Sequence, residues 1–95
     1  MIVREKIPIH TDGQHFIEFG ISTWTENAPE EEQTESIRRR YEGETGRFSP
    51  QGSSEIPIED MGLLITECIR RDRISIEEMS TILNAIADSI RRQTV

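Results

Sequence analysis

The chain has 95 residues, of which 34% are hydrophobic, and a formal net charge of −7 at pH 7. This length suffices for one domain, but so few hydrophobic residues make a monomeric core marginal, so we expect a homo-oligomer. The acidic balance argues against general nucleic-acid binding, because neutralisation of phosphates dominates that affinity.

Residues 2–24 predict a β-hairpin, because Asp12-Gly13 is a turn signal between two isoleucine-rich runs. A register with Ile9 opposite Ile17 gathers the apolar side chains on one face, so we prefer it. Pro8 has no N–H to donate and marks the first strand as an edge strand. A hairpin alone is unstable and needs helices or another chain to pack against.

Residues 25–42 predict a short, exposed, acidic helix. Thr25 or Asn27 could cap it, a run of glutamates suits its first turn, and Gly43 would end it. Ile37 and Tyr41 supply its apolar contact at a spacing of i, i+4. The glutamate run is expected to be a solvated face.

The C-terminal residues 57–95 predict two amphipathic helices that form an antiparallel hairpin. The first begins at Pro57, and the second is capped by Ser75, with Glu78 completing a capping box. Its apolar stripe contains Ile76, Met79, Ile82, Leu83, Ile86, Ala87 and Ile90. Two helices with one stripe each make half of a four-helix bundle, and a second copy could supply the other half.

The segment between these regions is the strongest functional signal in the sequence. A loop over residues 44–56, rich in glycine, serine and proline, leads into the predicted helix at Pro57. Helix N-termini bind anions, arginine donates charge-assisted hydrogen bonds, and an aromatic ring can stack on a ligand. The candidate ligand-binding residues are Arg47, Phe48, Ser49, Gln51, Gly52, Ser53 and Ser54.

Two other interpretations of this loop stay open. Its composition is typical of a flexible connector, and its serines could simply cap the following helix. Glu55, Glu59 and Asp60 place negative charge nearby, and the sequence contains no Walker or dinucleotide-binding glycine pattern.

Catalysis, a cofactor and a metal site are not expected. The serines and Cys68 have only His10 and His15 as candidate bases, and both histidines lie in the predicted hairpin. The two histidines lack further ligands at metal-binding spacing, so surface positions explain them better.

The single cysteine and the N-terminal residues bear on location. Cys68 can form no intramolecular disulfide, as is usual in a reducing compartment. Residues 1–10 carry charges and a proline where a signal peptide has an apolar run. No apolar stretch of the sequence is long enough to span a membrane. We therefore expect a cytoplasmic protein with no membrane partner.

The sequence thus predicts one α+β domain with a hairpin (1–24), an acidic helix and loop (25–56) and a self-associating helical hairpin (57–95). The expected function is non-enzymatic binding or sequestration of an anionic, nucleotide-like small molecule. The alternative is an acidic protein–protein adaptor or inhibitor, of a kind that phages and bacteria encode, which blocks a basic partner surface.

Overall fold

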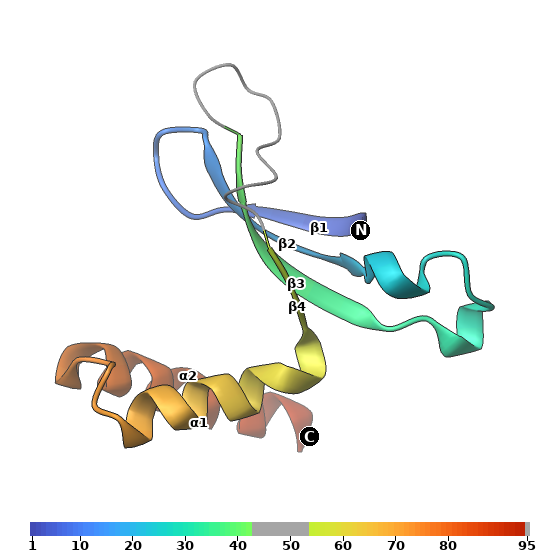
Figure 1. Ribbon diagram of the computed structural model, residues 1–95. Helices are drawn as coiled ribbons and strands as arrows, with labels where there is room; N and C mark the ends of the chain where they lie inside the picture. Colours follow the sequence, from blue (N-terminus) through green and yellow to red (C-terminus); the bar gives the residue numbers. More distant parts are fainter. Residues whose placement is uncertain (43–53, 95) are drawn as a thin grey trace. The chain divides into compact units, whose positions relative to one another are not determined.

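The computed structural model describes residues 1–42 and 54–94 of the chain. Within these ranges four antiparallel strands form one sheet in the order β1-β2-β3-β4, and two α-helices follow (Figure 1). The elements are β1 (Ile2–Pro8), β2 (His15–Ile21), β3 (Glu35–Tyr41), β4 (Glu55–Pro57), α1 (Met61–Arg70) and α2 (Ile76–Gln93). The predicted α+β class is confirmed. The chain divides into two compact units, Met1–Met61 and Gly62–Val95.

β1 and β2 form the predicted hairpin, but the expected register is wrong by two residues. Ile7, not Ile9, lies opposite Ile17. A shift of two residues keeps the side chains of residues 5–8 on their expected face of the sheet, whereas the irregularity between Val3 and Glu5 adds one residue to the shift at the start of β1. β1 is an edge strand of the sheet, as Pro8 predicts.

Gly20 allows a close approach of β1 and β2 where the pairing of the two strands is irregular. Val3 lies opposite Gly20 and Glu5 opposite Phe19, so the register shifts between Val3 and Glu5. A Cβ atom at Gly20 would lie 2.1 Å from the carbonyl oxygen of Ile2. Only glycine fits this position without displacing the backbone of β1.

The predicted helix over residues 25–42 is wrong. Two single-turn 3-10 helices, η1 (Thr23–Thr25) and η2 (Glu30–Glu32), are followed by the strand β3. Ile37 and Tyr41 are four residues apart, which suits one face of a strand as well as one face of a helix. Pairing with β2 along the whole of β3 decides between these alternatives, because strand formation depends on the neighbouring strand more than on local preference.

The first helix also begins differently from the prediction. The strand β4 and a 3-10 turn, η4 (Ile58–Asp60), precede α1, which starts at Met61. Pro57 therefore ends β4 and caps η4, and does not open an α-helix. Ser54 lies before β4 and not at the N-terminus of a helix.

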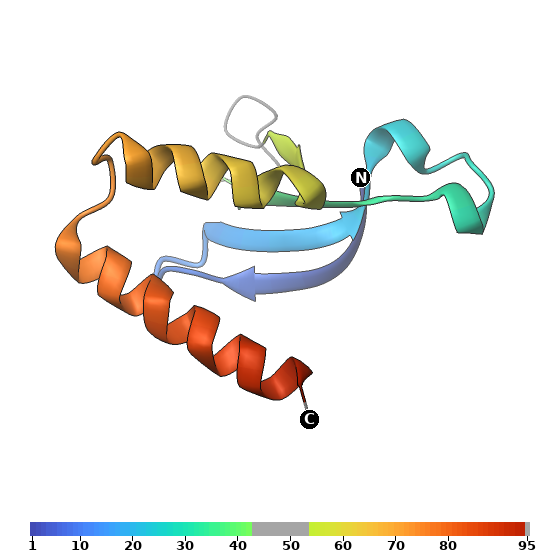
Figure 2. The same cartoon turned by 90° about the horizontal axis from the view of Figure 1, so that it is seen from below.

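The unit Gly62–Val95 contains α1, a turn and α2. The predicted cap of α2 is confirmed, because the Oγ atom of Ser75 accepts the N–H of Glu78 at 3.1 Å. In the turn Asp72 has a φ of +55°, and the N–H of Arg73 donates to the carbonyl of Cys68 at 2.9 Å. The two helices diverge from this turn (Figure 2). Neither described helix is both long and apolar enough to cross a membrane.

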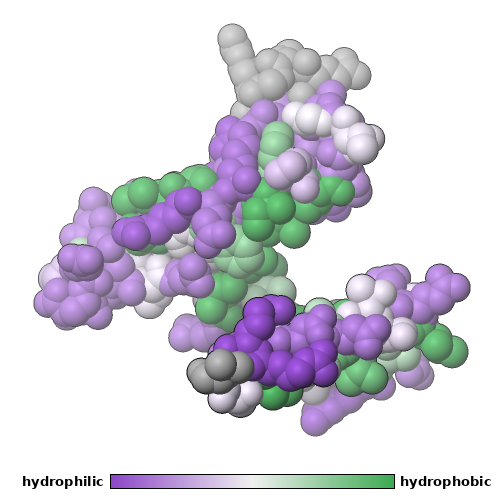
Figure 3. All heavy atoms as spheres, turned by 180° about the vertical axis from the view of Figure 1, so that it is seen from behind, coloured by the Kyte–Doolittle hydropathy of each residue, from purple (hydrophilic) through white to green (hydrophobic). Residues whose placement is uncertain are grey.

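Burial follows an unusual pattern. Among the described residues no hydrophobic side chain is buried, and the buried polar residues are Glu18, Ser22, Ser36 and Arg38. Hydrophobic residues instead reach the surface over both units (Figure 3). The sheet is therefore held together at its centre by polar contacts.

We predict that Gly20→Ala destabilises the sheet by about 1–3 kcal/mol, because the added methyl group overlaps the backbone of β1. The matched control is Gly62→Ala in α1, where a Cβ atom meets nothing within 4 Å and should stabilise the helix slightly. Urea denaturation of both variants measures the difference. Equal stability of the two variants would contradict the close approach at Gly20.

Candidate functional site

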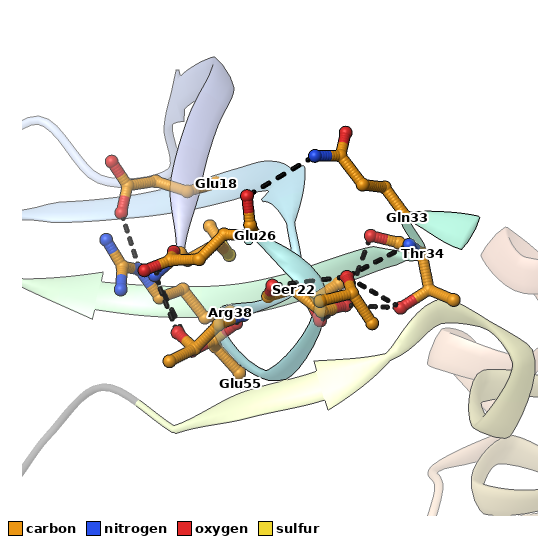
Figure 4. A network of polar contacts seen from close by, with 11 residues as sticks. Glu18, Ser22, Glu26, Gln33, Thr34, Arg38 and Glu55 are labelled. Atoms are coloured by element: carbon orange, nitrogen blue, oxygen red, sulfur yellow. Dashed lines mark hydrogen bonds and ion pairs between the residues drawn. The ribbon is translucent and has the colours of Figure 1, made fainter. Parts of the chain in front are cut away.

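The two faces of the sheet differ in chemistry, and the polar face is built around a buried ion pair. Glu18 of β2 lies opposite Arg38 of β3. The Nε atom of Arg38 donates to Oε1 of Glu18 at 2.8 Å (Figure 4). The Nη1 atom of Arg40 lies 3.6 Å from Oε2 of the same carboxylate. The Glu18 and Arg38 side chains are only 1% and 9% exposed. A buried carboxylate requires such a partner, since burial of an uncompensated charge is costly.

The same face continues to the outer edge of β1 as an alternation of opposite charges. The Nζ atom of Lys6 lies 2.6 Å from Oε1 of Glu42, and the Nε atom of Arg40 donates to the same oxygen at 3.0 Å. The Lys6 ammonium and the Arg40 guanidinium hold the pKa of Glu42 below its ordinary value. Lys6 also lies 4.2 Å from the centre of the Phe16 ring. Carboxylates thus neutralise the cations of this face, which makes it a poor site for an anion.

A second polar network ties the segment after β2 to β3 and β4. The Oγ atoms of Ser22 and Ser36 are 2.5 Å apart, and the N–H of Thr23 donates to Glu55 at 3.0 Å (Figure 4). Burial alone would raise the pKa of Glu55. The hydroxyl and N–H of Thr23, with the charges of the Met1 amino group and Arg38, outweigh that effect and lower the pKa. This network stabilises the connection between strands.

The other face carries a cluster of aromatic and cationic side chains where β2 begins and β3 ends. His15 and Tyr41 stack with ring centres 4.8 Å apart, and His10 meets His15 edge to face at 5.0 Å. The Nη2 atom of Arg39 lies 3.3 Å from Nε2 of His10. We call His10, His15, Arg39 and Tyr41 the rim cluster.

Asp12 holds the rim cluster in place from the turn between β1 and β2. Its Oδ1 accepts the N–H of Gln14 and its Oδ2 lies against Nδ1 of His15, both at 2.8 Å. The Gln14 N–H and the His15 ring hold the pKa of Asp12 below its ordinary value. Gly13, with a φ of +71°, closes the turn that brings these groups together.

An apolar hollow of about 260 Å³ adjoins the rim cluster on the same face. Its lining consists of Arg39 and the buried Arg38 together with Ile9, Ile17, Ile37, Ile56 and Met61. Arg39 is exposed, and no carboxylate of the described residues lies within ion-pair distance of its guanidinium. An exposed guanidinium beside stacked rings and an apolar surface can bind an anionic group and a planar apolar group of one ligand.

The sequence-predicted site lies almost wholly outside the described residues. Arg47, Phe48, Ser49, Gln51, Gly52 and Ser53 fall in that gap, and only Ser54 is described, as an exposed residue before β4. The described residues that flank the gap are Glu42, which follows β3, and Ser54, which precedes β4. Of these two strands, β3 carries Arg39 and Tyr41 of the rim cluster.

Sequence reasoning missed Arg39 and Tyr41 as site residues because it assigned them to a helix. An alternation of Ile37, Arg39 and Tyr41 with Ser36, Arg38 and Arg40 was the available signal for a strand with two different faces. The histidines were noticed, but as surface residues of a hairpin. In the structure His15, the first residue of β2, stacks on Tyr41, and His10, which follows β1, contacts Arg39.

Comparison with protein-family models, with curated proteins and with solved structures finds no match to this chain. Within residues 1–42 and 54–94 no three His, Cys, Asp or Glu side chains are grouped so that they could hold a metal ion.

We predict that Arg38→Met lowers the free energy of unfolding by about 3–5 kcal/mol, because it leaves Glu18 buried without its main partner. The double variant Glu18→Leu/Arg38→Met should recover most of this loss, since no buried charge remains. Chemical denaturation of the single and double variants measures both effects. A loss below about 1 kcal/mol in Arg38→Met would mean that the pair behaves like a surface ion pair.

The lowered pKa of Glu55 predicts acid sensitivity. Its stabilising effect is complete above its ordinary pKa of 4.5 and is lost as the pH falls through the lower pKa of the folded protein. Glu55→Gln should therefore flatten the dependence of melting temperature on pH below about 4.5. Glu30→Gln, at an exposed position, is the control and should leave that dependence unchanged. Identical profiles for all three proteins would refute the role of Glu55.

Proposed function

We propose that the protein is a non-enzymatic, homo-oligomeric binding protein of the cytoplasm that holds or sequesters an anionic, nucleotide-like small molecule at the rim cluster. The observation that carries this proposal is Arg39. It is exposed, it lies 3.3 Å from His10, and it lines the apolar hollow beside the stacked His15 and Tyr41 rings. A guanidinium suits a phosphate or carboxylate, and the rings and the hollow suit a base.

The loop residues predicted from the sequence belong to the same proposal. Arg47 would add a second guanidinium, and Phe48 would add a stacking face. Their segment is tethered at Glu42 and Ser54, close in sequence to Tyr41 and β4. The ligand would then lie between the rim cluster and this loop.

Self-association is the second part of the proposal. In the described residues no hydrophobic side chain is buried, although burial of apolar surface is the main driving force for folding. Contacts between copies would cover part of this surface. A small chain with few hydrophobic residues gains most from such contacts.

An acidic adaptor or inhibitor is the alternative function, and one feature favours it. Glu30, Glu31 and Glu32 form η2, and all three are exposed without an ion pair to another described residue. This concentrated negative charge would suit a basic surface of a partner protein. The rim cluster combines more kinds of contact than η2, so ligand binding is the preferred function.

A thermal-shift assay with a panel of nucleotides and inorganic phosphate tests the preferred function. We predict that Arg39→Gln abolishes the ligand-induced shift without lowering the melting temperature of the ligand-free protein, because an exposed arginine contributes little to folding. Arg92→Gln, at an exposed arginine of α2, is the matched control and should respond as the wild type does.

Two further variants separate the two functions. Arg47→Ala should weaken the shift if the loop completes the site, whereas Glu30→Gln/Glu31→Gln/Glu32→Gln should leave it intact and would impair only an adaptor. If no compound shifts the melting curve of the wild type, ligand binding at the rim cluster is wrong and the adaptor takes its place.

A further inference from the structure

The exposed apolar seam of α2 is the strongest feature that the ligand site does not use. Ile76, Met79, Leu83, Ile86 and Ile90 follow one another at alternating spacings of three and four residues. Four of them remain strongly exposed: Ile76 (82%), Leu83 (66%), Ile86 (49%) and Ile90 (57%). This alternation is the pattern by which two helices pack side chains into each other's gaps.

The helix α1 leaves most of this seam uncovered. α1 and α2 diverge from their turn (Figure 2), and an apolar hollow of about 220 Å³ lies beside Ile69, Met79, Ile82, Leu83 and Ile86. Leu83 and Ile86 thus line a hollow and also face solvent. The seam therefore has room for another helix.

The distribution of charge along α2 identifies which helix fits. The first turn carries Glu77 and Glu78, and the last turn carries Arg91 and Arg92. Two copies of α2 in antiparallel orientation bring each acidic start beside a basic end, and their helix dipoles also oppose. A parallel pair would place the glutamates of the two copies side by side, and likewise their arginines, and the repulsion between like charges costs free energy.

The apolar residues are complementary in that same orientation. A two-fold axis near Asn84 and Ala85 would bring Leu83 opposite Ile86 of the second copy and Met79 opposite Ile90 of the second copy, with each contact made twice. With about 100° of rotation per residue, Glu77 and Arg91 lie on the same flank of α2, so the acidic end of one copy and the basic end of the other lie along the same flank of the pair.

We therefore propose that α2 is a two-fold dimer interface, in which the seams of two copies pack antiparallel and their ends pair by charge. This proposal rests on the self-association part of the proposed function and names the surface that performs it. It does not depend on the rim cluster or its ligand.

The oligomeric state of the full chain tests the interface. We predict a wild-type dimer or larger oligomer at micromolar concentration in analytical ultracentrifugation, and at least a tenfold weaker association for Leu83→Glu. Leu63→Glu in α1 is the matched control, since Leu63 is 64% exposed and Leu83 is 66% exposed, and it should associate as the wild type does. Circular dichroism confirms that each variant keeps its helices.

Cysteine cross-linking tests the orientation in a Cys68→Ser background, which removes the native thiol. Antiparallel packing predicts that Met79→Cys and Ile90→Cys proteins, when mixed and oxidised, give a disulfide-linked dimer, whereas either protein alone gives little. Efficient cross-linking of either variant by itself would show a parallel pair and overturn the proposal.

The remaining outcomes separate this inference from the proposed function. A monomeric wild type would overturn both self-association and the interface. An oligomeric wild type that Leu83→Glu leaves unchanged would overturn the interface alone. A dimer lost in Leu83→Glu supports the interface, whatever the nucleotide assay shows for Arg39→Gln.

Discussion

The buried ion pair between Glu18 and Arg38 is the contact on which the sheet depends. It joins β2 to β3, the two central strands, and each edge strand pairs with only one of them. A slip of one residue would turn Glu18 or Arg38 to the apolar face and leave a buried charge without a partner. The pair therefore sets the register, and the Ser22–Ser36 contact supports it at the far end of the strands.

Unlike the ion pair, the apolar side chains of the described residues are not buried. In most small domains they form the buried centre, but here the described hydrophobic residues stay at least partly accessible in both units. Apolar surface that folding leaves uncovered is available for association. Self-association therefore belongs to the proposed function, and the seam of α2 is the surface proposed to perform it.

The three consecutive arginines of β3 show how strand geometry separates structure from function. Successive side chains of a strand point to opposite faces. Arg38 and Arg40 therefore meet carboxylates on the polar face, whereas Arg39 meets His10 and the apolar hollow on the other face. The proposed ligand site follows from this division, because Arg38 and Arg39 both line the hollow but only Arg39 is exposed.

The sequence by itself determined those features that depend on near neighbours: the α+β class, the first hairpin with Pro8 on its edge strand, and the cap of α2 at Ser75. Turn residues, caps and long apolar periodicities act within a few residues, so they can be read directly. Only the tertiary structure decided that residues 35–41 form a strand, and with it the rim cluster. Ile37 and Tyr41 fit a helix and a strand equally well, and the choice was made by β2, a distant segment that supplies the hydrogen bonds and the carboxylate of Glu18.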